Sequence, residues 1–149
     1  MIPLLVLVVA FVAFRLLGLA FPWMADWQHA LRAALGVMFV LTASAHWGKR
    51  RTDLLRMVPA SFGNAGFWVT VTGIAEVLIA IGLQIPRFAF FTGTIAAVML
   101  LCLFPANAKA AREKLTIAGQ KVPALGPRLA IQAVFLAAIA AAIWLLPSR

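Results

Sequence analysis

The chain has 149 residues, of which 64% are hydrophobic and 11% charged, and its mean hydropathy is +1.02. Soluble domains are about half apolar and about a quarter charged, so the composition excludes an ordinary soluble domain and indicates one integral membrane bundle. The net charge of +9 does not indicate nucleic-acid binding, because Lys and Arg gather in two short connections between apolar runs, where charge sets membrane topology. Cys102 is the only cysteine, which excludes an intrachain disulfide and dithiol redox chemistry within the chain.

Five apolar runs are predicted to cross the membrane, because about 20 helical residues span a hydrocarbon core about 30 Å thick. These runs are residues 2–21, 31–47, 67–83, 88–104 and 129–146. The first lacks a basic leader and contains Arg15, so we interpret it as a retained helix rather than a signal peptide. The predicted fold class is therefore all-α, a single transmembrane bundle over residues 1–149. An extra N-terminal span (2–21) would precede a four-helix core (31–146).

Basic residues are distributed unequally between the two sides of this predicted bundle. Nine would lie on one side, in the second and fourth connections: Lys49, Arg50, Arg51, Arg56, Lys109, Arg112, Lys114, Lys121 and Arg128. Three would lie on the other side: Arg32, Arg87 and Arg149. Because basic loops stay in the cytoplasm, we predict a multi-pass protein with its N-terminus inside and its C-terminus outside. Within the second connection, Thr52 is predicted to cap a short helix that lies in the membrane interface.

Glu76 lies inside the third apolar run, about 12–15 Å deep at 1.5 Å per residue. A charged residue at such a depth costs about 2.5 kcal/mol or more on insertion scales, which makes Glu76 a candidate functional residue. Thr72 lies one helical turn earlier on the same face, so we expect the two side chains to be within hydrogen-bonding reach. We expect Glu76 to be neutral, because no basic residue is predicted at its depth. The alternative is a stretched ion pair between Glu76 and Arg15. A purely structural role for Glu76 also stays open.

The polar residues of the apolar runs are predicted to line one cavity that opens toward the cytoplasmic leaflet. Glu76 and His46 are the candidate catalytic acid and base, and the candidate ligand-binding residues are Thr72, Asn107, Arg128, Gln132, Trp47 and Trp68. His46 is predicted at the cytoplasmic end of its helix, about 10 Å from the height of Glu76, so direct contact is not assured. An arginine at the start of a span is most often a phosphate-facing anchor, and this alternative stays open for Arg128. No metal site is predicted, because one His, one Glu and one Asn at different depths lack the ligand density of zinc or iron sites.

Five short motifs follow one another along the core: Ala45-His46-Trp47, Met57-Val58-Pro59, Thr72-Gly73-Ile74-Ala75-Glu76, Phe104-Pro105-Ala106-Asn107, and Arg128 followed by Gln132. In order and spacing, from about Leu31 to Trp144, they resemble the DoxX family of small bacterial membrane proteins. The extra first span and Trp47, where a Phe is expected, depart from the family pattern. The resemblance implies a four-helix bundle in the bacterial cytoplasmic membrane. It also implies an association with quinone-linked sulfur or thiol oxidoreductases.

Three functions stay open. The leading hypothesis is binding of a lipophilic small molecule, with a quinone as the preferred ligand or cofactor, in a redox-linked membrane complex. Histidine and amide side chains donate hydrogen bonds to quinone carbonyls, a buried Glu carries protons, and a cytoplasmic redox partner would supply electrons. The first alternative is a non-catalytic membrane subunit whose basic face docks a cytoplasmic partner or anionic lipid. The second is an enzyme that acts alone on a lipid, with Glu76 and His46 as acid and base. A homo-oligomer is compatible with all three.

Overall fold

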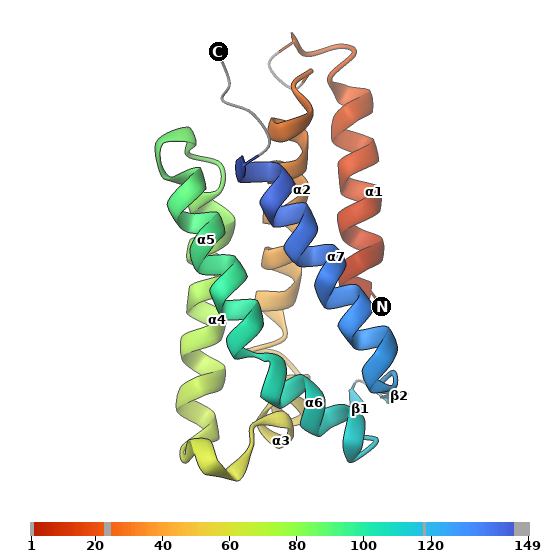
Figure 1. The fold of residues 1–149 in the computed structure, drawn as a ribbon, viewed down its shortest axis with the longest axis vertical. Helices are drawn as coiled ribbons and strands as arrows, with labels where there is room; N and C mark the ends of the chain where they lie inside the picture. The colour runs from red at the N-terminus through yellow and green to blue at the C-terminus, as the bar shows by residue number, and fades with distance from the viewer. Residues whose placement is uncertain (1, 23–24, 118, 145–149) are drawn as a thin grey trace.

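The computed structural model describes residues 2–22, 25–117 and 119–144, and over these residues the chain is predominantly helical. Figure 1 shows long helices side by side, with short helices and a small hairpin at one end. The elements are α1 (Ile2–Leu17), α2 (Trp27–Ser44), α3 (Arg51–Met57), η2 (Ala60–Phe62), α4 (Ala65–Gly82), α5 (Pro86–Cys102), α6 (Phe104–Arg112), β1 (Thr116–Ile117), β2 (Gln120–Lys121) and α7 (Leu125–Trp144). The predicted predominance of helix is confirmed, and the two short antiparallel strands were not predicted.

Four of the helices form a closed ring. α2 packs against α4 and α7, and α5 packs against the same two helices. α1 lies outside this ring along α2. The largest side chains that are almost fully buried fill the interior: Leu35, Met38, Phe39, Leu83 and Ile139. Small residues let the helices approach closely, as at Gly93 of α5, where a Cβ would lie 2.6 Å from Ile143 of α7.

The outer surface of the ring is apolar as well. Leu78 of α4 and Phe91 of α5 are 62% and 67% exposed. Large apolar side chains on α1 and α7, such as Leu5 and Trp144, are similarly exposed. An exposed apolar surface of this extent marks a face that contacts lipid or another protein.

Three segments are long and apolar enough to cross a membrane: α4, the α5–α6 segment Pro86–Arg112, and α7. α1 is apolar but has 16 residues, slightly fewer than the roughly 17–25 that a span requires. α2 has 18 residues, but Gln28, His29 and Arg32 in its first two turns lower its hydropathy. Of the five predicted spans, three are therefore supported by length and composition, and the other two stay predictions.

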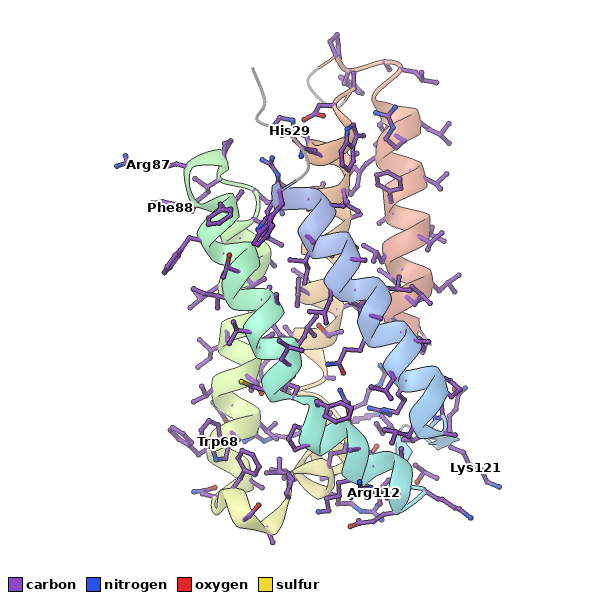
Figure 2. All side chains as sticks on the ribbon, viewed as in Figure 1. His29, Trp68, Arg87, Phe88, Arg112 and Lys121 are labelled. Carbon is purple, nitrogen blue, oxygen red and sulfur yellow. The ribbon has the colours of Figure 1, made fainter. Side chains whose placement is uncertain are left out.

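The two connections that are rich in basic residues meet at one end of the bundle, where α3 packs against α6 (Figure 1). The short helix predicted in the second connection is present as α3. Its N-cap residue is Arg50 rather than the predicted Thr52, because α3 already begins at Arg51 and Thr52 lies within its first turn. Figure 2 places Arg112 and Lys121 at this end and Arg87 at the other. We call it the basic end.

Helix α6 lies outside the sequence prediction, which ended the fourth span at Phe104 and treated the following residues as a connection. In the structure the chain bends at Leu103 and continues as α6, with Pro105 in the first turn. Proline is tolerated there because the N–H groups of a first helical turn have no partner within the helix. Asn107 consequently lies within a second helix rather than after the end of a span.

Candidate functional site

His46 and Glu76 lie beside each other between α2 and α4. The His46 Nε2 is 3.6 Å from the Glu76 Oε2, and the two side chains are 10% and 9% exposed. This separation exceeds a normal N–H···O hydrogen bond of about 2.7–3.2 Å. Among the described residues, the Glu76 Oε2 has no hydrogen-bond partner. Such a carboxyl oxygen is unusual, because nearly all buried polar atoms are hydrogen-bonded.

The prediction that His46 lies about 10 Å from the height of Glu76 is wrong. It assumed a helix that continues to Trp47, whereas α2 ends at Ser44 and the following turn folds against α4. His46 packs there on Gly73, where a Cβ would lie 2.6 Å from the His46 Cβ. Gly73 therefore makes room for the imidazole at the depth of Glu76.

Arg51 fastens the turn that carries His46 to α4. Its Nη1 donates to His46 O at 2.8 Å, and its Nη2 donates to Thr70 Oγ1 at 2.9 Å and to Gly66 O at 3.3 Å. Hydrogen bonds that involve a charged group are stronger than those between neutral groups. In the sequence, Arg51 is used only to predict the membrane topology, because its spacing from His46 does not indicate that it holds the turn against α4.

The surroundings of His46 determine where its protons lie. His46 Nδ1 is 2.6 Å from Val69 O, and a carbonyl oxygen only accepts, so Nδ1 carries a hydrogen. A neutral imidazole then has a bare Nε2, which would face a Glu76 carboxylate acceptor to acceptor. A proton on either Nε2 or Glu76 removes this repulsion, and both arrangements have no net charge. The premise that no basic residue lies near Glu76 is therefore wrong, whereas the neutrality of the acid stays a prediction.

The predicted hydrogen bond between Thr72 and Glu76 is not present. Thr72 Oγ1 donates to Trp68 O at 2.8 Å and lies 3.5 Å from His46 Nδ1. A threonine in a helix commonly bonds the carbonyl four residues earlier, and that bond replaces the predicted one. Thr72 thus lies beside the imidazole ring without partnering the acid.

Asn107, Arg128 and Gln132 form a second polar group, which we call the α7 cluster. Arg128 Nη2 donates to Asn107 Oδ1, and Gln132 Nε2 donates to Leu100 O at 3.1 Å. These bonds join α7 to α6 and α5. Among the described residues, no hydrogen bond or ion pair links the cluster to His46 or Glu76. The continuity of the predicted pocket therefore stays a prediction.

Trp47 and Trp68, predicted as ligand contacts, differ in their surroundings. Trp47 is 51% exposed, and its ring centroid is 6.1 Å from that of His46. Trp68 is 40% exposed, and its Nε1 donates to Phe62 O at 2.8 Å, near the basic end (Figure 2). Trp47 therefore lies beside His46, whereas Trp68 anchors the connection that precedes α4.

A cleft of about 470 Å³ lies at the basic end and not at Glu76. Its lining residues are Pro59, Phe104, Pro105, Ala108, Lys109, Arg112 and Glu113. None of the eight candidate site residues predicted from the sequence is among them. The cleft thus represents a feature that the sequence patterns did not reveal, because it is formed by the unpredicted helix α6.

The remaining ionisable residues of the opposite end do not join the site. Arg15 Nη1 donates to Ala25 O in the connection between α1 and α2, so the alternative pair with Glu76 is not formed. His29 Nδ1 is 2.7 Å from Asp26 Oδ2, near the same connection (Figure 2). Over the described parts of the chain, no group of three or more His, Cys, Asp or Glu residues could hold a metal ion.

A comparison with protein families matches residues 35–144 to the family described as Domain of unknown function (DUF8561). The chain belongs to this family. The DUF8561 match runs from within α2 to the end of α7 and includes both the His46–Glu76 pair and the α7 cluster. A search of curated proteins and a search of solved structures found no match. Membership of the DUF8561 family assigns no activity, and the resemblance to the DoxX family stays a prediction.

Proposed function

We propose that this is a multi-pass membrane protein that binds the polar head of a lipophilic small molecule at the His46–Glu76 pair and exchanges a proton with it. A quinone is the leading candidate for that molecule. The observation that carries the proposal is the buried Glu76 Oε2, which lacks a hydrogen-bond partner and lies 3.6 Å from the His46 Nε2. Ionisable residues inside membrane helices are rare and usually functional, and a protonated Glu76 would have an O–H free to donate to a ligand carbonyl.

The chemistry of the pair suits quinone reduction. A quinone takes up two electrons and two protons to become a quinol, and its carbonyl oxygens accept hydrogen bonds. A proton carried by His46 Nε2 or by the Glu76 carboxyl group would be available to one of these oxygens. The bond from His46 Nδ1 to Val69 O would hold the ring in place during the transfer. The second proton would come from water, and a cytoplasmic redox partner would supply the electrons, since the chain has no dithiol.

The membrane placement rests on the three apolar segments and on the apolar outer surface. With the basic end in the cytoplasm, the N-terminus would be inside and the C-terminus outside. A reporter enzyme fused after Arg149 is therefore expected to be active only outside the cytoplasm. Activity of that fusion in the cytoplasm would contradict the five-span topology.

A second candidate function is that of a non-catalytic membrane subunit. Its supporting observation is the exposure of Lys49, Arg50, Arg56 and Lys114 at the basic end, which offers a docking surface for an acidic cytoplasmic partner. This function needs no ligand at Glu76. Quinone binding and its dependence on Glu76 therefore distinguish the two candidates.

The test is saturable binding of a decyl-benzoquinone to the full-length protein in lipid nanodiscs. Binding is followed by quenching of tryptophan fluorescence, to which Trp47 contributes beside the site. Glu76→Gln is expected to weaken binding about tenfold or more, because a hydrogen bond to a charged group is worth about 1.5–3 kcal/mol. The variant keeps the shape of the side chain, and circular dichroism checks that the helices are retained.

The matched control is Asp26→Asn, an acid-to-amide change at the opposite end of the bundle. Asp26 caps α2, and Asn caps a helix about as well, so its quinone binding is expected to stay within about twofold of wild type. Non-saturable quenching in the wild type, or equal binding by both variants, would contradict the proposal. Phospholipid as the only molecule co-purified with the protein would favour the subunit function.

A further inference from the structure

We infer that the cleft beside α6 binds the phosphate headgroup of an anionic membrane phospholipid. The cleft has a volume of about 470 Å³ and lies between Pro59, at the end of the α3 connection, and α6. It shares no lining residue with the His46–Glu76 pair. The inference rests on the membrane placement proposed above but does not depend on the quinone.

The lining of the cleft has two chemical characters. Pro59, Phe104, Pro105 and Ala108 provide apolar wall, and Lys109 and Arg112 provide cationic groups. A ligand that satisfies both has an apolar part and an anionic head. A soluble anion would leave Phe104 and the prolines uncovered, and a purely apolar ligand would leave the two cations without a counter-ion.

Lys109 is already held in position. Its Nζ donates to Arg56 O and to Val58 O, both at 2.9 Å. An ammonium has three N–H donors, so one is left for a further acceptor, and over the described residues the protein supplies none. Because the two carbonyls fix the side chain, little conformational entropy is lost when an anion binds there.

Arg112 and Glu113 indicate how many negative charges the expected ligand carries. Arg112 is the last residue of α6 and is exposed, and a guanidinium binds phosphate oxygens through two parallel hydrogen bonds. Glu113, which also lines the cleft, disfavours a doubly charged anion. A phosphodiester with a single charge, as in a phospholipid, therefore fits better than inorganic phosphate.

The position of the cleft agrees with such a ligand. Figure 2 shows Arg112 at the basic end, past the end of α5 and near the level of the first turns of α4. In the proposed orientation this level is the boundary between the cytoplasmic leaflet and water. Anionic phospholipids are attracted there by lysine and arginine side chains close to the membrane surface.

The experiment measures lipid retention by the full-length protein in detergent, using native mass spectrometry. Dioleoyl-phosphatidylglycerol, dioleoyl-phosphatidylcholine and inorganic phosphate are added in separate arms. The wild type is expected to retain phosphatidylglycerol about fivefold or more over phosphatidylcholine, because phosphatidylglycerol has a net negative charge, whereas the choline ammonium of phosphatidylcholine offsets its phosphate charge and is repelled by Lys109 and Arg112. Arg112→Gln is expected to abolish this preference.

The matched control is Lys121→Gln, which removes one positive charge at the same end (Figure 2) but outside the cleft. Its preference for phosphatidylglycerol is expected to change less than about twofold. Equal losses in the two variants would overturn the inference, because they would indicate diffuse attraction by the whole basic end. Displacement of phosphatidylglycerol by millimolar inorganic phosphate would overturn it in favour of a free-phosphate site.

A second variant separates the lipid tail from the headgroup. Phe104→Ala keeps both cations and removes the largest apolar wall of the cleft, so retention of phosphatidylglycerol is expected to fall while soluble anions are unaffected. Unchanged retention would contradict a bound lipid. Quinone binding at Glu76 is expected to be unaltered in Arg112→Gln, so this inference and the proposed function fail independently.

Discussion

The His46–Glu76 pair and the α7 cluster both place polar side chains inside an apolar bundle, but they differ in whether these side chains are hydrogen-bonded. In the α7 cluster, Arg128 bonds Asn107, and Gln132 bonds a main-chain carbonyl of α5. At the pair, the Glu76 Oε2 is buried without a hydrogen bond. Polar groups that satisfy one another fasten membrane helices together. A buried acid left unsatisfied is not needed for that purpose, which is why we assign ligand chemistry to the pair alone.

Among variants that distinguish the pair from the α7 cluster, Gly73→Ala is expected to lose the most stability. The new Cβ would lie 2.6 Å from the His46 Cβ and 2.8 Å from its Cγ, and overpacking of this kind costs about 1–3 kcal/mol. We expect a loss of about 2 kcal/mol in the free energy of unfolding, measured by circular dichroism during unfolding in sodium dodecyl sulfate. Quinone binding should be lost as well.

The control for Gly73→Ala is Gly126→Ala, where a new Cβ would have no other atom within 4 Å. Gly126 lies in the first turn of α7, so this variant should keep the stability of the wild type to within about 0.5 kcal/mol. Full stability and full quinone binding in Gly73→Ala would show that His46 is not held against α4.

The second effect concerns Arg51, which holds the His46 turn. Arg51→Ala removes the hydrogen bonds to His46 O, Thr70 Oγ1 and Gly66 O, and we expect a loss of about 1.5 kcal/mol in stability. Quinone affinity should fall with it, because the imidazole is no longer positioned. The exposed neighbour Arg50 provides the control, since Arg50→Ala removes the same charge. Equal affinities in the two variants would restrict Arg51 to a structural role.

A smaller effect is expected at the α7 cluster. Asn107→Ala removes the acceptor of the Arg128 guanidinium and should reduce stability by about 1 kcal/mol. Quinone binding should persist, because no bond connects Asn107 with the pair. Loss of binding at retained stability would instead unite the two polar groups in one site, as the sequence alone predicts.

The smallest effect is expected from Gln132→Leu. Its bond to Leu100 O joins α7 to α5, and hydrogen bonds between membrane helices average about 0.6 kcal/mol. The unfolding midpoint should shift correspondingly little, and quinone affinity should stay unchanged. A large loss of quinone affinity would indicate that Gln132 contacts the ligand. The α7 cluster and the His46–Glu76 pair would then belong to one site.

Residue chemistry predicted the helical regions well, and it singled out Glu76 as a candidate because one acid in a long apolar run is informative by itself. The start of α4 has a signal in the sequence as well, since Asn64 accepts a hydrogen bond from Phe67 N and caps the helix. In contrast, the end of α2 carries no such signal. Ser44 precedes neither a proline nor an immediate glycine, so the helix was extended to Trp47 and His46 was placed too far from Glu76.

The contacts that define the site depend on tertiary structure. His46 reaches the depth of Glu76 only because Gly73 on another helix leaves space for it, and small residues occur at many positions of any membrane bundle. The cleft at the basic end depends on α6, whose first turn contains Pro105. A proline after an apolar run predicts the end of a helix more readily than the start of another.

The attachment of His46 has a mechanical consequence. Its main chain continues from α2, whereas its ring is bonded to the main chain of α4 through Val69 O. A slide of one helix along the other by a single residue rise, about 1.5 Å, would be a large fraction of the 3.6 Å between Nε2 and Oε2. The distance between Nε2 and Oε2 therefore depends on the register between α2 and α4.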